Sequence, residues 1–254
     1  MITIKNEKEI EKMERAGRLL AEILNKVIKE VDSGVTTFEL NQLAENLILQ
    51  AGAIPAFKGF KSDGRVFPAA LCTSINQEVV HGIPNQKNVL QRGDIIGIDC
   101  GLKLDGFYAD MARTIPVGKP SDKVAKLLTI ARECLEKGTN KAQAGARLGS
   151  ISNAIQTHAE KNGFSVVRNL AGHGIGKDLH EKPDVFNYGD AETGPVLKPG
   201  MTLAIEPMIN VGHYDVKTKE DGWTIVTKDD SLSAHFENSI LITETDAEIL
   251  TRIK

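Results

Sequence analysis

The stretch LQRGDIIGID at residues 90–99 decides the fold, because a second stretch, LKPGMTLAIE at residues 197–206, repeats its pattern. The two align without a gap, and both read Leu, two residues, Gly, four residues, Ile and then an acid. Each follows a His-Gly-Ile tripeptide, and each precedes a later acid, Asp110 in the first half and Glu237 in the second. Either motif alone is common where a strand begins, but three features in matched order favour an internal duplication.

The surrounding sequence predicts the same order of elements in both halves. An apolar stripe at helical spacing predicts a helix over about 7–31, and Thr36 with Glu39 forms a capping box for a second helix that stops at Gly52. In the second half, Ser121 caps a helix to about residue 137, and a fourth helix covers about 148–162. We expect strands within 71–76, 94–104, 164–170, 201–211, 224–228 and 234–243, and loops at 56–70 and 180–195.

This order, helix-helix-strands twice over, predicts an α/β (α+β) fold with a duplicated architecture. No low-complexity linker separates the halves, so we expect one domain over residues 1–254, with pseudo-repeats at about 7–118 and 121–250.

The composition is that of an ordinary globular protein, with 41% hydrophobic residues and a net charge of −3. This charge argues against a specific nucleic-acid partner or an acidic membrane surface, although a transient ribosome contact through a small patch is compatible with it. The three cysteines are scattered, which indicates reduced thiols rather than a zinc site. The charged N-terminal segment lacks an apolar signal core, so we expect a cytoplasmic protein without a membrane partner.

Two acids of the first half are predicted to lie on one face of a hairpin. If Asp105 and Gly106 form the turn, Asp99 faces Ala112, and Asp110 is its diagonal neighbour on the same face. Like charges this close, among apolar residues, are destabilising unless something neutralises them. A bound cation resolves the conflict.

The second half repeats this arrangement, because Glu206 and Glu237 each interrupt an apolar strand segment. Each acid taken alone also fits a charge at a strand edge, but four at repeat-related positions favour a metal site. His173, between glycines, adds an imidazole that is free of steric hindrance. Carboxylates with one imidazole suit Mn, Fe(II), Co or Zn, and four carboxylates can neutralise two divalent ions, as in two-metal hydrolytic centres.

The remaining histidines have weaker predictions. His81 and His180 fit either substrate contacts or hydrogen-bonded loop histidines. We expect His158 to be solvated and His213 to lie in a turn. His235 stands two residues before Glu237, so on a strand the two side chains share a face, and His235 is expected beside the metal site.

The chain resembles the methionine aminopeptidases of the short bacterial type (type I) along nearly its whole length. The segments that carry the resemblance are TSINQEVVHGIP (73–84), GDIIGIDCGLKLDGFYADMARTIPVG (93–118), LAGHGIGKDLHEKP (170–183), LKPGMTLAIEPM (197–208) and DGWTIVTKDDSLSAHFENSI (221–240). The resemblance implies the pita-bread fold, in which a pseudo-twofold axis relates two halves of antiparallel sheet with helices packed on the outer face. It also implies a metallopeptidase that removes the initiator methionine from nascent polypeptides. We expect the protein to be a monomer.

The resemblance further implies a role for each site residue. Two divalent ions are held by Asp99, Asp110, His173, Glu206 and Glu237, with Asp110 and Glu237 bridging. Glu206 accepts a proton from the attacking water, His180 binds the scissile carbonyl oxygen, and His81 contacts the scissile nitrogen. The pocket for the methionine side chain consists of Phe60, Phe67, Cys72, Leu179 and Trp223, although Trp223 fits a core aromatic equally well.

The sequence departs from the family pattern in three places. The loop around residues 58–67 is longer and more basic than usual, Leu179 replaces a common phenylalanine, and His235 and Asn238 replace a glutamine and a histidine. None of these changes removes a ligand.

Two other classes remain open from the sequence. One is a proline-specific (Xaa-Pro) peptidase of the same fold, and the other is a non-catalytic binding protein of this fold. The retained set of five ligands disfavours the binding protein. A phosphate-binding α/β protein is disfavoured because the chain lacks the Walker lysine-hydroxyl pair after a glycine-rich loop.

Overall fold

The computed structural model describes residues 1–252 and contains the predicted pairs of helices. The helices are α1 (Glu7–Lys29), α2 (Thr37–Gln50), α3 (Asp122–Asn140) and α4 (Gly149–Lys161). The capping box of Thr36 and Glu39 is present, and Ser121 caps α3 by accepting from the Val124 N–H. These caps satisfy backbone donors that a helix start leaves without partners, which explains why the starts were predictable.

The first sheet is built around a long hairpin. Strand β6 (Ile95–Leu104) pairs with β7 (Phe107–Pro116) and also with β1 (Ile54–Pro55) and β4 (Leu71–Ile75), all antiparallel. Asp105 and Gly106 form the turn, with φ of 51° and 87°. Both values are left-handed, as a two-residue hairpin turn requires. Asp99 faces Ala112, so the predicted register is confirmed.

The second sheet has the strand order β10-β9-β11-β16-β17. Its strands are β9 (Ala171–Gly174), β10 (Glu181–Phe186), β11 (Thr202–Ile205), β16 (Asn238–Ile242) and β17 (Ala247–Ile249). Three smaller sheets join β15 (Ser233–His235), β12 (Met208–Asn210) and β8 (Ser165–Val166); β13 (Val216–Thr218), β14 (Ile225–Thr227) and β5 (Glu78–Val80); and β2 (Lys61–Ser62) with β3 (Arg65–Val66).

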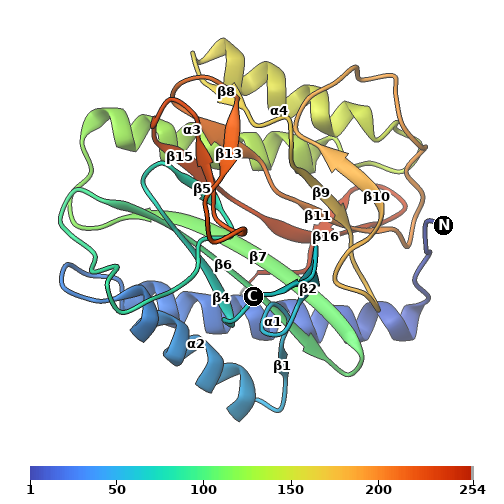
Figure 1. Ribbon diagram of the computed structural model, residues 1–254. Coiled ribbons are helices and arrows are strands. Elements are labelled where there is room, and N and C mark those ends of the chain that lie inside the picture. Colours follow the sequence, from blue (N-terminus) through green and yellow to red (C-terminus); the bar gives the residue numbers. More distant parts are fainter. Residues whose placement is uncertain (253–254) are drawn as a thin grey trace.

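The helices cover the sheets from opposite sides. In Figure 1, α1 and α2 lie on one side of the strands, and α3 and α4 lie on the other. One apolar core packs α1 and α2 against β4, β6 and β7, and a second packs α3 and α4 against β11, β12 and β16. Each large side chain buried in these cores contributes about 1.5–3 kcal/mol relative to exposure. The strands are therefore covered by two separate apolar cores, one for each pair of helices.

The two halves meet where β7 approaches β16. The Oγ of Ser239 accepts from the backbone N–H of Asp110 and donates to its carbonyl oxygen, both over 2.9 Å. This contact joins β7 and β16, which are far apart in sequence. It places Asp110 of the first half near the acids of the second half. That the halves arose by duplication within one domain stays a prediction.

Several predicted boundaries are wrong for physical reasons. The expected loop at 180–195 contains β10, which has the form of an edge strand and therefore tolerates Pro183. The expected loop at 56–70 contains the β2–β3 hairpin, turned at Asp63 and Gly64 with positive φ. Only Ser165–Val166 of the expected strand at 164–170 pairs, and α3 runs three residues beyond its expected end.

The two strands expected to run through Glu206 and Glu237 are each broken at the acid. Glu206 and Pro207 separate β11 from β12, and Phe236 and Glu237 separate β15 from β16. Pro207 cannot donate to a ladder, which accounts for the first break. Across residues 1–252, no helix is both long and apolar enough to cross a membrane.

Candidate metal centre and active site

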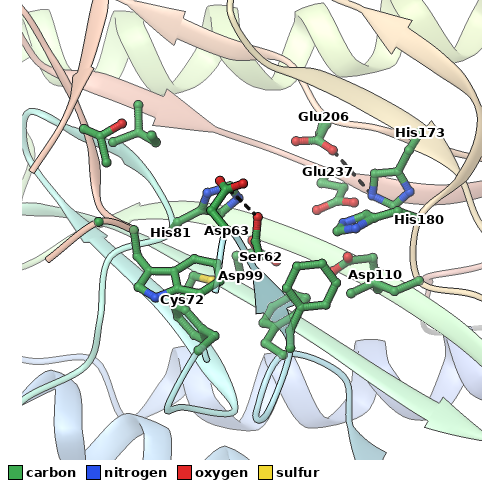
Figure 2. Close-up of a pocket in the computed structure, with 18 residues that line it drawn as sticks. Ser62, Asp63, Cys72, His81, Asp99, Asp110, His173, His180, Glu206 and Glu237 are labelled. Carbon is green, nitrogen blue, oxygen red and sulfur yellow. Dashed lines mark hydrogen bonds and ion pairs between the residues drawn. The ribbon is translucent and has the colours of Figure 1, made fainter. Parts of the chain in front are cut away.

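All twelve predicted site residues line one cavity of about 400 Å³. They come from both sheets and from the loops around them: Phe60, Phe67, Cys72, His81, Asp99, Asp110, His173, Leu179, His180, Glu206, Trp223 and Glu237. The folded chain therefore brings the twelve predicted residues together in one cavity. Figure 2 shows the carboxylates of Glu206, Glu237 and Asp110 in one region beside His173 and His180.

Three predicted ligands form a compact cluster at the base of the cavity. Each of Asp110, His173 and Glu237 offers one ligand atom, and these three atoms lie within 4.8 Å of one another. All three residues are buried. Glu206 adds a second carboxylate, with Oε1 at 3.7 Å from the Nε2 of His173.

The orientation of His173 follows from its hydrogen bonding. Its Nδ1 lies 2.8 Å from the carbonyl oxygen of Gly174, which can only accept, so Nδ1 carries the proton. The lone pair of Nε2 then points toward Glu206. Two acceptors that face each other across 3.7 Å leave room for a cation between them. Gly172 is required here, because a Cβ at this position would lie 2.3 Å from the Ala204 carbonyl oxygen.

The carboxylates are held where their charges are costly. Burial raises the pKa of Asp99 to about 7. Burial, followed by the charges of its neighbours, raises the pKa of Asp110 well above its usual range, and the same causes raise the pKa values of Glu206 and Glu237. Desolvation penalises the charged form of each group, and the carboxylates repel one another.

The donor set fits divalent cations. Asp99 Oδ1 and Glu237 Oε1 are buried and have no hydrogen-bond partner within the described part of the chain. An unpaired buried carboxylate oxygen is among the most costly groups in a folded protein. A metal ion would satisfy these oxygens and offset the repulsion between the acids. The imidazole and carboxylate ligands suit the borderline metals named above.

His81 and His180 are exposed residues that line the cavity without joining the cluster of ligand atoms. His81 has φ of 60°, which is unusual for a residue with a side chain and marks a position where the fold imposes strain. Gly82 after it is required because a Cβ would lie 2.1 Å from the Thr73 carbonyl oxygen. The His180 ring packs edge-on against His173 and Phe60, with ring centroids 4.5 Å and 5.1 Å away.

Aromatic and aliphatic side chains form the other wall. Phe67 and Trp223 pack edge-on at 5.3 Å between centroids, and Leu179 is buried. Cys72 pairs with Asp99 across β4 and β6, so the apolar wall lies directly beside the cluster of carboxylates. Burial raises the pKa of the Cys72 thiol well above its ordinary value, which leaves it an inert apolar contact.

Sequence reasoning missed six residues that line the cavity: Phe57, Ser62, Asp63, Thr218, Gly222 and Ile225. Phe57 stands three residues before Phe60, and this aromatic spacing was the signal available for it. The others come from the tips and edges of two hairpins whose packing over the cavity has no local sequence signature.

Two histidine predictions are settled outside this cluster. His158 was expected to be solvated, but its Nε2 lies 2.7 Å from Glu133 Oε2 on the neighbouring helix α3, so that prediction is wrong. His213 was expected in a turn, but it lies in the exposed, irregular loop between β12 and β13, next to bends at Gly212 and Tyr214. His235 is buried, with Nε2 at 4.0 Å from Glu237 Oε2, so its expected position beside the acids is confirmed.

Comparison with known proteins agrees with this geometry. The model of metallopeptidase family M24 matches residues 11–244. A methionine aminopeptidase from Clostridium acetobutylicum is 51% identical over 251 residues, which cover 99% of each chain.

Solved structures extend the comparison to the fold. The crystal structure of methionine aminopeptidase from Rickettsia prowazekii superposes with a TM-score of 0.96 at 46% identity, over 99% of this chain and 100% of that one. The prolidase from Pyrococcus horikoshii shares the fold at a lower TM-score of 0.79 and 27% identity, and the match covers 64% of the prolidase chain. The chain belongs to metallopeptidase family M24 and, within it, to the methionine aminopeptidases of the short bacterial type.

Proposed function

We propose that this protein is a metal-dependent aminopeptidase that removes the N-terminal initiator methionine from nascent polypeptides. The observation that carries the proposal is the junction of four carboxylates, two buried and two half-buried, and His173 with an apolar, sulfur-containing pocket in one cavity. Acids whose charged forms are costly without a cation lie next to a wall suited to an unbranched thioether side chain.

We assign the metal-binding role to Asp99, Asp110, His173, Glu206 and Glu237, in a centre for two divalent ions of Co, Mn, Fe(II) or Zn. Bound metal would supply Lewis acidity, which lowers the pKa of a water and polarises a carbonyl group. Asp110 and Glu237 would be shared by both ions, as the family resemblance implies. Their convergence with His173 within 4.8 Å supports this assignment.

The chain's own residues would then move protons and orient the peptide. Glu206 accepts the proton of the attacking water and later returns it to the leaving amine. His180 donates a hydrogen bond to the scissile carbonyl oxygen as negative charge develops there. His81, at the exposed side of the cavity, contacts the scissile nitrogen. The packing of His180 against Phe60 and His173 restricts the orientation of its ring.

The methionine side chain would occupy the wall formed by Phe60, Phe67, Cys72, Leu179 and Trp223. Phe67, Cys72 and Leu179 are buried, while Phe60 and Trp223 are half-buried at the opening. An apolar pocket of this kind discriminates by shape and by the area of apolar surface that the substrate buries.

Peptide hydrolysis distinguishes this proposal from the proline-specific alternative, which the lower similarity to prolidase already disfavours. The metal-loaded protein is given two substrates, a peptide that begins Met-Gly and a peptide that begins Xaa-Pro, and their cleavage is compared. Release of methionine from the first, with little cleavage of the second, supports the proposal. Preference for the Xaa-Pro bond overturns it, and binding without cleavage would support the non-catalytic alternative.

A monomeric state, a cytoplasmic location and a transient ribosome contact complete the proposal as predictions from the sequence. Size-exclusion chromatography with light scattering tests the first, with a mass near the 27.6 kDa of the chain expected.

A further inference from the structure

His235 is a buried imidazole at the edge of the acidic cluster, and no role has yet been given to it. Its side chain is 4% exposed, and its Nε2 has no hydrogen-bond partner among residues 1–252. The nearest charged atoms are Glu206 Oε2 at 3.7 Å and Glu237 Oε2 at 4.0 Å. A buried ring nitrogen that faces two carboxylates without a bond is an unexplained polar group.

The backbone of His235 is held firmly, which limits where the ring can go. The hydroxyl of Thr114 accepts from the His235 N–H over 2.9 Å and donates to its carbonyl oxygen over 2.8 Å. His235 also pairs with Met208 across β12 and β15. The ring therefore approaches the acids from a fixed strand end, on the side of the second half of the chain.

Glu206 is bracketed by two imidazoles. Its Oε1 lies 3.7 Å from the Nε2 of His173, and its Oε2 lies 3.7 Å from the Nε2 of His235. The two nitrogens differ in chemistry. His173 has its proton on Nδ1, so its Nε2 offers a lone pair to a cation. The Nε2 of His235 faces carboxylate oxygens, which are acceptors, so a proton on that nitrogen is the favourable tautomer.

We propose that His235 is a positioning residue that donates its Nε2–H to Glu206 and holds this carboxylate in the orientation that binds metal. The proposal rests on the proposed function, because it needs Glu206 as a ligand. The 3.7 Å separation is longer than a hydrogen bond, so the proposal requires the carboxylate to turn slightly toward Nε2 when a cation binds. Hydrogen bonds to ligating carboxylates orient them and strengthen metal binding.

Direct ligation by His235 is the less favoured arrangement. The Nε2 of His235 lies within 4.0 Å of carboxylate oxygens of both Glu206 and Glu237, so a donated hydrogen bond accounts for its position without a metal contact. Its nitrogen lies on the Oε2 side of Glu206, whereas His173 faces Oε1. Positioning and ligation make different predictions for the coordination sphere, which spectroscopy can separate.

Calorimetric titration of metal-free protein with Co(II) tests the proposal. The variants His235→Leu and His235→Met remove the donor, and His235→Gln keeps an N–H at similar reach. We expect the Leu and Met variants to bind Co(II) about 10–100-fold more weakly. The Gln variant should recover most of this loss. His213→Leu, in an exposed loop, is the matched control and should leave the affinity unchanged.

Visible absorption of the Co(II) complexes supplies a second readout. Unchanged band positions in His235→Gln and His235→Met, measured at saturating Co(II), agree with a residue outside the coordination sphere. The proposal is overturned if His235→Leu and His235→Met both bind Co(II) as tightly as the parent protein. It is also overturned if the absorption bands shift in all His235 variants, because that result shows direct ligation. Circular dichroism identifies a variant that fails to fold, and the remaining variants then decide. If the parent protein releases no methionine, the proposed function is contradicted, but the Co(II) affinities of the variants can still be compared.

Discussion

The backbone N–H of Glu237 donates to the carbonyl oxygen of Ala112 over 3.0 Å, which joins the second half of the chain to the strand that carries Asp110. The carboxylates from the two halves are therefore brought together by backbone hydrogen bonds. Because the acids repel one another in the folded state, the junction stores a cost that a cation would relieve. Metal binding and folding stability should consequently be linked.

We expect the stability of the metal-free protein to fall as pH rises above about 6.5. Burial raises the pKa of Asp99 to about 7 and raises that of Asp110 well above its usual range, so the folded state binds more protons than the unfolded one. Stability then decreases with rising pH. Burial lowers the pKa of His173 to about 4 and that of His235 to about 3. These histidines act in the opposite direction, but only below about 6.5.

Thermal unfolding at pH 6.5 and 8.5, with a chelator and with added Mn(II), measures this linkage. One pKa unit corresponds to about 1.4 kcal/mol, or roughly 2–4 °C in a chain of this size. The metal-free protein should melt lower at pH 8.5, and metal should raise the melting temperature more at pH 8.5 than at 6.5. A metal-free melting temperature that rises over this interval would contradict the electrostatic account.

Replacing a central acid should raise metal-free stability while abolishing function. Asp110→Asn removes a charge from the repelling cluster, so we expect a higher melting temperature in the presence of chelator. Metal affinity and turnover should fall by at least roughly 100-fold, since partners outside the coordination sphere alone cost about 10–100-fold. Asp105→Asn, at an exposed turn where asparagine tolerates positive φ, is the control. A stable variant with normal metal binding would remove Asp110 from the site.

Replacing His180 should separate catalysis from metal binding. In His180→Ala the carbonyl oxygen loses a donor, so kcat should fall by roughly 10²–10³-fold. Metal content, measured by atomic emission, should stay at the level of the parent protein because His180 faces the cavity outside the ligand cluster. Loss of metal together with activity would instead assign His180 to the coordination sphere.

The buried ion pair of Lys5 and Glu181 should stabilise the loop that carries His180. Lys5 Nζ lies 2.6 Å from Glu181 Oε2, and the two side chains are only 4% and 9% exposed. Glu181 Oε1 also accepts from the Lys177 N–H over 2.8 Å. Lys5→Met should cost about 3–5 kcal/mol, because it leaves a buried carboxylate without its partner.

Urea unfolding measures this cost, and the double variant Lys5→Met/Glu181→Gln is its control. Removing the charge from both partners should recover part of the lost stability. If the single variant is as stable as the parent protein, the pair contributes nothing to the fold.

Local chemistry explains which parts of this architecture were predictable. The Asp105-Gly106 turn sets the β6–β7 register, so the placement of Asp99 opposite Ala112 followed from the sequence alone. Strand β10 was missed because Pro183 and the polar residues around it are typical of a loop, and only its edge position makes a strand tolerable.

The candidate site was predictable as a set of residues but not as a geometry. The repeat and the family resemblance predicted twelve of the residues that line the cavity, and six others were missed. The bracketing of Glu206 by His173 and His235 depends on how separate strands pack, and no local pattern encodes it. The same holds for Asp63, which reaches the cavity from a hairpin tip.

The most direct measurement is methionine release from a Met-Gly peptide by metal-free protein reconstituted in turn with Mn(II), Fe(II), Co(II) and Zn(II). The account predicts no turnover without metal and release of free methionine with at least one of these ions. Asp110→Asn under identical conditions should remain inactive. Failure to release methionine with any of the four metals, from protein that is folded and has bound metal, would contradict the central claim.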